Sequence, residues 1–272
     1  QLLRKAAPEK AIHAVDLFPD KDVKDRLEAA GMNTIVADLL KRSTYEELPQ
    51  VPNIYYLAGM KFGASKKEPL TWAMNAHLPA LVCEAFQQSK ILAFSTGNIY
   101  PFVPLWTGGA DEETTPRPIG DYAQSCLGRE RIFQYFSEAN NTPVVIIRLN
   151  YANECRYGIV VDLTQKIMQD ITIDLSMGYV NIIWQADVNN YIARAINLAD
   201  SPAAFLNVAG PETAGVRKLC RTIGEMLGKE PKFEGEETDT ALLSNSGKCF
   251  DLYGYPHVPL DQVVRTAVNW VK

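Results

Sequence analysis

The stretch KILAFSTGNIY, residues 90–100, determines how the rest of the chain is interpreted. It begins as an apolar, β-rich run and ends in small polar residues, which indicates a buried strand whose carboxyl end opens onto a loop. Similar apolar runs lie before it, in NIYYLAGM (53–60), and after it, in TPVVIIRLN (142–150). The patterns between these runs predict a long helix over about 69–89 and another that begins near Gly120. Strand and helix that alternate in this way predict an α/β fold with a doubly wound parallel sheet and helices on both faces.

The pattern continues towards both ends of the chain. AIHAVDLF (11–18) and NTIVADLL (33–40) predict two further strands, with the helix KDVKDRLEAAG between them. After residue 150 the alternation is less regular, with helical runs such as RYGIVVDLTQKIMQD and the short strand AFLNVAG. We therefore expect a large domain over 1–150 and a smaller α/β region over 151–272 that caps the carboxyl edge of the sheet.

The composition is that of a globular protein and excludes some functions. Of the 272 residues 47% are apolar and 22% charged, and the net charge of −5 argues against a nucleic-acid or anionic-membrane surface. No apolar run reaches the roughly 18–20 residues that a membrane-spanning helix needs. The three histidines lack ligand spacing, so we expect no metal site. The five cysteines never show CxxC spacing, which suits a reducing cytoplasm: Cys83, Cys126, Cys155, Cys220 and Cys249.

Small or polar residues follow four of the predicted strands. Asp16, the pair Asp38-Leu39, the run Leu57-Ala58-Gly59 and Thr96 each stand at a strand end. Because the carboxyl ends of parallel strands meet at one edge, these residues are expected to line one crevice. Asp16 could accept hydrogen bonds from the adenosine ribose hydroxyls, or it could be a solvated strand-end residue. No arginine follows it to meet a 2′-phosphate, which favours NAD over NADP.

Two of these strand ends have two interpretations each. Asp38 and Leu39 could flank an adenine ring, one by hydrogen bonding and one by packing. A helix N-cap is an equal alternative for Asp38. Gly59 lets a ligand approach the backbone closely, although a glycine after a strand is also usual in a simple turn.

Thr96 and Tyr122 are the residues best suited to acid–base chemistry. A tyrosine can act as general acid or base towards a carbonyl or hydroxyl oxygen, and a neighbouring hydroxyl can hold the same oxygen. With a pKa of about 10, a phenol is only about one part in a thousand ionised at pH 7, so a nearby cation would help. The residue one helical turn on is Cys126, which supplies no positive charge. Arg129 lies on the same face and could be a substitute cation or a solvated helix residue.

Several segments in order resemble the extended short-chain dehydrogenase/reductase family, the NAD-dependent epimerases and dehydratases. FSTGNIY looks like the family's fifth strand, with Thr96 at the catalytic Ser/Thr position. ADEETTPRPIGDYAQS looks like the run that ends at the catalytic tyrosine, here Tyr122. VVIIRLNY is similar to the sixth strand and places Asn150 at its end, and WQADVNNYIARAI and FLNVAGPE resemble later segments. The resemblance implies a Rossmann-like fold.

The resemblance also implies roles for residues and partners. Residues 1–150 would bind the dinucleotide, residues 151–272 would mainly bind a small sugar-type substrate, and two copies would pair through the helices over 69–89 and 120–139. Thr96 and Tyr122 would be catalytic, with Cys126 at the position where the family has a lysine. The residues expected to contact NAD are Asp16, Asp38, Leu39, Leu57, Ala58, Gly59, Tyr122 and Asn150.

The chain departs from the family pattern in two places. The opening strand and its GxxGxxG turn, which cradle the pyrophosphate at a helix N-terminus, do not appear before QLLRKAA, so we expect the native protein to begin some residues earlier. The second departure is Tyr-x-x-x-Cys in place of Tyr-x-x-x-Lys. A cysteine is too short to reach the nicotinamide ribose, and its anionic form would oppose ionisation of Tyr122.

Two functions therefore remain open. The first is an NAD(P)-dependent epimerase or dehydrogenase that acts on a sugar or nucleotide sugar. The second is a binding protein of the same fold whose chemistry is impaired, such as a sensor or structural partner. A nucleotide-sugar diphosphate would need cations, for which Arg156, Arg194 and Arg217 are candidates or ordinary surface residues.

Overall fold

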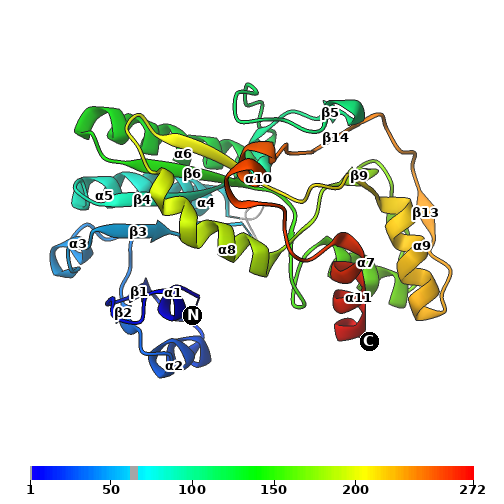
Figure 1. The fold of residues 1–272 in the computed structure, drawn as a ribbon, viewed down its shortest axis with the longest axis horizontal. Coiled ribbons are helices and arrows are strands. Elements are labelled where there is room, and N and C mark those ends of the chain that lie inside the picture. The colour runs from blue at the N-terminus through cyan, green and yellow to red at the C-terminus, as the bar shows by residue number, and fades with distance from the viewer. Residues whose placement is uncertain (1, 62–66) are drawn as a thin grey trace.

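The central element of this computed structural model, which describes residues 2–61 and 67–272, is a four-stranded parallel sheet (Figure 1). Its strand order is β11-β6-β4-β3, and all three pairings are parallel. The strands are β3 (Asn53–Tyr56), β4 (Lys90–Thr96), β6 (Val144–Leu149) and β11 (Ala204–Val208). The predicted α/β fold with a parallel central sheet is confirmed.

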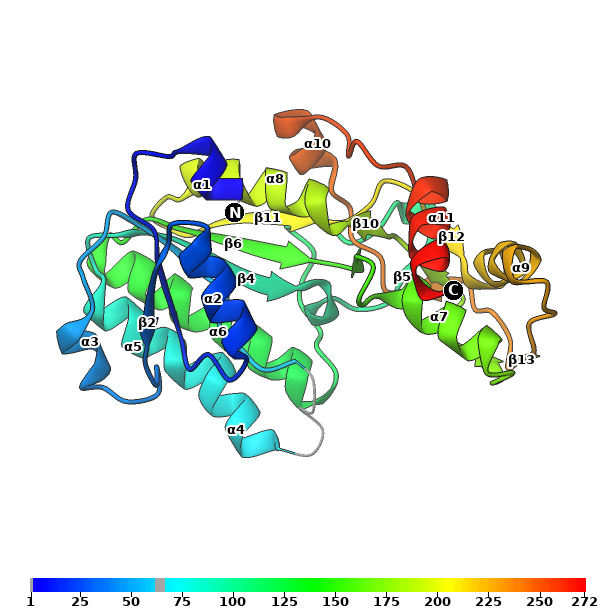
Figure 2. The same ribbon diagram turned by 90° about the horizontal axis from the view of Figure 1, so that it is seen from below.

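Helices cover both faces of this sheet, as the doubly wound pattern predicted (Figure 2). Alternate residues of each strand face opposite sides, so Ile91 and Ile146 pack with Phe133 on one face while Leu92 and Ile147 pack in a second cluster on the other. The first face carries α4 (Glu68–Trp72), α5 (Leu78–Ala85) and α6 (Gly120–Asn140), and the second carries α1 (Leu2–Ala6), α8 (Gln185–Ala195) and α10 (Gly247–Tyr253).

The helix predicted over 69–89 is built in three parts. Between α4 and α5 the chain forms a π-helical turn, Ala73–His77, before α5 ends at Ala85. Such turns inside helices are frequent at functional sites. The turn brings Asn75 to a fully buried position.

The first two strands form a separate pair that lies apart from β3 (Figure 1). β1 (His13–Asp16) pairs in parallel with β2 (Asn33–Val36), and α2 (Lys21–Ala29) connects them. Val15 and Ile35 pack against the apolar cluster of the main sheet. Within the described ranges the other edges of β1 and β3 carry no strand. That a strand with a glycine-rich turn precedes Gln1 in the native protein stays a prediction.

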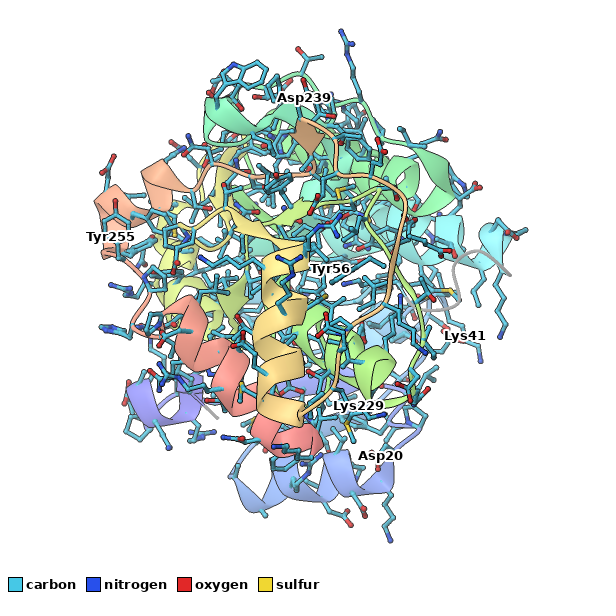
Figure 3. All side chains as sticks on the ribbon, turned by 90° about the vertical axis from the view of Figure 1, so that its right-hand side faces the viewer. Asp20, Lys41, Tyr56, Lys229, Asp239 and Tyr255 are labelled. Carbon is cyan, nitrogen blue, oxygen red and sulfur yellow. The ribbon has the colours of Figure 1, made fainter. Side chains whose placement is uncertain are left out.

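The C-terminal part has its own apolar core, built by α7 (Ile159–Met168), α9 (Val216–Leu227) and α11 (Leu260–Val271). Figure 3 looks onto this part, with Lys229 at one end of α9 and Asp239 at the edge of the molecule opposite Asp20. β11 and α8 come from the same half of the chain but complete the main sheet, and the division at residue 150 stays a prediction.

Short elements complete the described chain. Four two-residue strand pairs are β5 (Val103–Pro104) with β14 (Thr240–Ala241), β7 (Ala152–Asn153) with β10 (Ile183–Trp184), β8 (Ile173–Asp174) with β13 (Phe233–Glu234), and β9 (Tyr179–Val180) with β12 (Ala214–Gly215). One more helical turn, α3 (Thr44–Glu47), follows β2. In residues 2–61 and 67–272 no helix has the length and apolar character needed to cross a membrane.

Candidate functional site

The three residues predicted to form a catalytic group lie together at the carboxyl end of β4. Thr96 is the last residue of that strand, and Tyr122 and Cys126 come from the first turns of α6. The Tyr122 hydroxyl lies close enough to the side chains of Thr96 and Cys126 for both to affect its pKa. Thr96 is 7% exposed and Cys126 1% exposed, and Tyr122 is partly buried.

Burial governs the protonation of the Tyr122 phenol and the Cys126 thiol. It raises the pKa of the Tyr122 phenol above its ordinary value of 10.0, and the neighbouring Cys126 raises it further. The neighbouring Thr96 hydroxyl and the positive charge of Arg129 lower this pKa, and both effects are smaller. Burial also raises the pKa of the Cys126 thiol, against weaker lowering by Arg129 and Lys61. Both groups therefore hold their protons at neutral pH.

Arg129 reaches into the site and is not a solvated helix residue. Its side chain is buried beside the ring of Tyr56, which is labelled in Figure 3. Its guanidinium donates to the Phe94 carbonyl at 2.8 Å and to the Asn75 side-chain oxygen at 2.5 Å. No carboxylate of the described residues pairs with it in a salt bridge. A buried cation that is held by neutral groups gives the site a positive potential.

Asn75 was not anticipated from the sequence, although it organises the site. Its side-chain oxygen accepts from Met60 N–H at 2.8 Å, and its amide donates to the Met60 carbonyl and the Ser125 hydroxyl, both at 3.0 Å. The same amide lies 3.9 Å from the Cys126 sulfur. Asn75 inside the largely apolar run AMNAHLPALV was the available signal, because a buried amide must find partners.

The group that lies close to the backbone at Gly59 is the side chain of Arg129. A Cβ at this position would lie 2.2 Å from Nη2 of Arg129 and 2.9 Å from the Asn75 side-chain oxygen. The glycine after β3 thus makes room for the buried guanidinium. Of its neighbours, Leu57 is 67% exposed and Ala58 packs on the apolar cluster of the sheet. Their contact with a cofactor stays a prediction.

The two predicted strand-end carboxylates lie on the separate β1–β2 pair. One oxygen of Asp16 accepts from Phe18 N–H at 2.8 Å, and its other oxygen has no hydrogen-bond partner in the described part of the chain. Asp38 accepts from Leu40 N–H at 3.1 Å in a turn and is no helix N-cap, because α3 begins only at Thr44, and Leu39 packs into the apolar cluster. Cofactor contacts by these three residues stay predictions.

Asn150 is buried and links the two halves of the chain. Its amide donates to the Asn181 side-chain oxygen and to the Leu242 carbonyl, both at 3.3 Å. A Cβ on Gly97 would lie 2.7 Å from its side chain, so it packs directly beneath the loop after Thr96. Here its visible role is structural, and the predicted cofactor contact is untested.

A buried polar network lies beside the site. Glu130 and Arg148 form an ion pair at 3.0 Å with both side chains nearly inaccessible to water. Arg148 also donates to the Tyr100 hydroxyl at 2.8 Å, and that hydroxyl donates to Asn207 at 2.8 Å. Glu112 accepts from the backbone N–H of Asn207 at 2.7 Å. The network joins α6, β6 and β11 behind the catalytic group.

The sequence matches the model of one protein family. The model of the NAD dependent epimerase/dehydratase family matches residues 2–152, and the chain belongs to this family. The resemblance found in the sequence is therefore confirmed. No curated protein matches the sequence of this chain.

The solved structures that resemble this chain share its fold at low identity. UDP-glucuronic acid 4-epimerase from Bacillus cereus, in complex with NAD, is 17% identical with a TM-score of 0.82, and the match covers 99% of this chain and 94% of that one. UDP-glucose 4-epimerase from Thermotoga maritima, with UDP-glucose, is 15% identical with a TM-score of 0.80 and the same coverage. RMD from Pseudomonas aeruginosa, complexed with NADPH, is 16% identical with a TM-score of 0.77 over 96% of this chain and 99% of that one. The Rossmann-like fold predicted from the sequence is thereby confirmed.

Replacing Gly59 tests the contact with Arg129. We expect Gly59→Ala to lower the free energy of unfolding by about 1–3 kcal/mol, because the new methyl group overlaps the guanidinium. In an Arg129→Ala background the loss becomes smaller, since the main overlap is gone. Urea unfolding measures the loss of unfolding free energy in both backgrounds.

Gly128→Ala is the matched control, because a Cβ there meets Ala76 at 3.4 Å, an ordinary contact. It is expected to change stability by less than about 1 kcal/mol. Equal stability of Gly59→Ala and the unmodified chain would show that Arg129 does not occupy this space.

Proposed function

We propose that this protein is an NAD-dependent oxidoreductase of the epimerase/dehydrogenase type that acts on a sugar or nucleotide sugar. The observation that carries the proposal is the position of Tyr122 beside Thr96 at the carboxyl end of β4. Ligands bind beyond this edge in doubly wound folds. The UDP-sugar epimerases of similar fold provide the first substrates to test.

The residues at the strand ends fit a nicotinamide dinucleotide. The Asp16 carboxylate has an oxygen available for the adenosine ribose, and its negative charge disfavours a 2′-phosphate, which supports NAD over NADP. The Ser95 hydroxyl, buried beside Thr96, has no hydrogen-bond partner in the described part of the chain, as expected of a group that awaits a ligand. When bound, the cofactor supplies or accepts the hydride.

Tyr122 and Thr96 handle the proton of the same substrate oxygen. In the reducing direction the Tyr122 hydroxyl donates its proton to the carbonyl oxygen, while the Thr96 hydroxyl orients that oxygen by a hydrogen bond. In the oxidising direction Tyr122 must accept the proton. The positive charge of Arg129 favours the phenolate in that step, although burial and Cys126 outweigh it in the unliganded chain.

The proposal includes a cytoplasmic location and a homodimer. A cytoplasmic location follows from the cysteine pattern of the sequence. A homodimer through α4, α5 and α6 follows from the family resemblance. Exposed Leu70 and Trp72 on α4 support such a contact.

A catalytically impaired binding protein is the second candidate. The buried, neutral Cys126 thiol and the raised pKa of Tyr122 favour it, because both oppose formation of the phenolate. Such a protein would bind the dinucleotide as a sensor or structural partner. It would show no hydride transfer with UDP sugars at any pH.

Tyr122→Phe tests the proposed mechanism. We expect hydride transfer between NAD and UDP sugars to fall by about 10²–10⁴-fold, the usual contribution of a general acid or base. Tyr135→Phe is the control, since Tyr135 lies on the same helix with 64% of its surface exposed, and it is expected to leave the rate unchanged. Absorbance of NADH measures the rate, and full activity of Tyr122→Phe would remove Tyr122 from the mechanism.

The raised pKa of Tyr122 predicts different pH profiles for the two directions. Reduction uses the protonated phenol, which is fully present below its pKa, so kcat/KM is expected to stay flat from about pH 6 to about pH 9. Oxidation uses the phenolate, whose fraction rises about tenfold per pH unit up to that pKa. Steady-state rates in both directions measure this difference. A plateau of the oxidation rate near pH 7 would mean that the pKa is lowered and not raised.

A further inference from the structure

Arg129 is a buried cation whose hydrogen-bonding capacity is only partly used. A guanidinium carries five N–H groups. Three of them have acceptors: Nε donates to the Asn75 carbonyl at 3.4 Å, Nη1 to the Phe94 carbonyl at 2.8 Å and Nη2 to the Asn75 side-chain oxygen at 2.5 Å. Within residues 2–61 and 67–272 the remaining two N–H groups have no acceptor. Buried donors of a charged group are costly to leave unpaired, so these two groups indicate a ligand that supplies oxygen acceptors.

The Ser95 hydroxyl gives a second, independent indication at the same place. Strand residues alternate between the two faces of a sheet, and Ile91 and Ala93 of β4 pack with Phe133 on the face that α6 covers. Ser95 continues this row and is 7% exposed, and its hydroxyl has no partner in the part of the chain that the structure describes. Two buried polar groups with unused capacity therefore lie between the end of β4 and α6.

The guanidinium lies at the edge of the sheet where ligands bind in doubly wound folds. Gly59 follows β3, and a Cβ on it would lie 2.2 Å from Nη2 of Arg129. The Phe94 carbonyl that accepts from Nη1 is two residues before Thr96, the end of β4. The charge of Arg129 is also close enough to act on the Tyr122 phenol. The unused N–H groups thus belong to the same strand-end edge as the catalytic pair.

The chemistry at Tyr122 determines which part of a dinucleotide meets this edge. Tyr122 transfers the proton of the substrate oxygen, and the carbon that bears this oxygen exchanges a hydride with the nicotinamide ring. The nicotinamide end of the cofactor, and not its adenine end, therefore belongs beside Tyr122 and Arg129. The ribose at that end has hydroxyl oxygens, which accept hydrogen bonds from N–H groups.

We propose that Arg129 binds the ribose next to the nicotinamide ring, with its two remaining N–H groups donating to the ribose hydroxyl oxygens. The assignment rests on the proposed function for the orientation of the dinucleotide. It makes position 129 the source of the charge and the donors that Cys126, one helical turn earlier, does not supply. The Tyr-x-x-x-Cys sequence is then compatible with a working cofactor site.

A fluorescence titration with NADH tests the assignment. We expect Arg129→Met to weaken NADH binding at least about tenfold, because hydrogen bonds from a charged donor are lost. Arg131→Met is the matched control: Arg131 is exposed on the same helix, where it donates to Gln134 at 2.6 Å, and its loss is expected to leave the Kd unchanged. A Kd within about twofold of the unmodified chain in Arg129→Met would overturn the assignment.

Two further variants protect the test against a folding defect. Arg129→Lys keeps the positive charge but not the planar fork of donors, so we expect a smaller loss of about threefold or more. In the Arg129→Met background, Cys126→Lys returns a cation to the helix one turn earlier and is expected to recover part of the binding. Urea unfolding shows which variants fold, and an unchanged Kd in each variant of Arg129 that folds would contradict the assignment.

The two halves of NADH locate the contact. Reduced nicotinamide mononucleotide holds the nicotinamide ribose and ADP does not, so calorimetric titration should show that Arg129→Met weakens binding of the mononucleotide at least about fivefold and leaves ADP unchanged. A loss for ADP alone, or an equal loss for both, would place the guanidinium at the phosphates and overturn the assignment.

These binding assays are independent of turnover, so the two proposals fail separately. A loss of mononucleotide binding in Arg129→Met, without hydride transfer to any sugar by the unmodified chain, would reject the proposed function and leave the Arg129 assignment standing. Hydride transfer with UDP sugars, together with equal NADH binding in Arg129→Met, would do the reverse.

Discussion

The hydrogen bonds of Asn75 are the constraint on which the site depends. They join the segment after β3, the π-helical turn and the start of α6, because one amide meets Met60, Ser125 and the guanidinium of Arg129. Asn75 is fully buried, and an amide in that position must satisfy its donors and its acceptor within the protein. The position of α6 relative to β4 follows from these bonds, and with it the approach of Tyr122 to Thr96.

Arg129 gives this junction its electrostatic character. A buried guanidinium held by a carbonyl and an amide keeps its full positive charge within reach of Tyr122 and Cys126, whose pKa values it lowers against the effect of burial. Gly59 is small because this side chain lies against it. The neighbouring Glu130 faces the other way and neutralises Arg148, so one helix places two adjacent charged residues in separate buried environments.

The sequence was sufficient for the parallel sheet, for the helices on its two faces and for the meeting of Thr96 with Tyr122, since each depends on local apolar runs and on the rule that strand ends share one edge. It was not sufficient for Asn75, because a polar residue in a largely apolar helix does not show which face of the helix is buried. Nor could it show that Arg129 fills the space at Gly59 or that Glu112 meets Asn207, since these contacts join residues far apart in the chain. The sequence also could not show that β1 and β2 form a pair separate from β3, because pairing between strands depends on the whole sheet.

Binding of NADH to the full chain tests the account most directly. The four tryptophans can transfer excitation energy to bound NADH, so a fluorescence titration reports the complex without any substrate. The account predicts saturable binding with a Kd of about 1 mM or tighter, and NAD is expected to compete for the same site. Fluorescence that shows no saturable change at millimolar NADH would contradict it, since Tyr122 and Thr96 would then lie beside no hydride carrier.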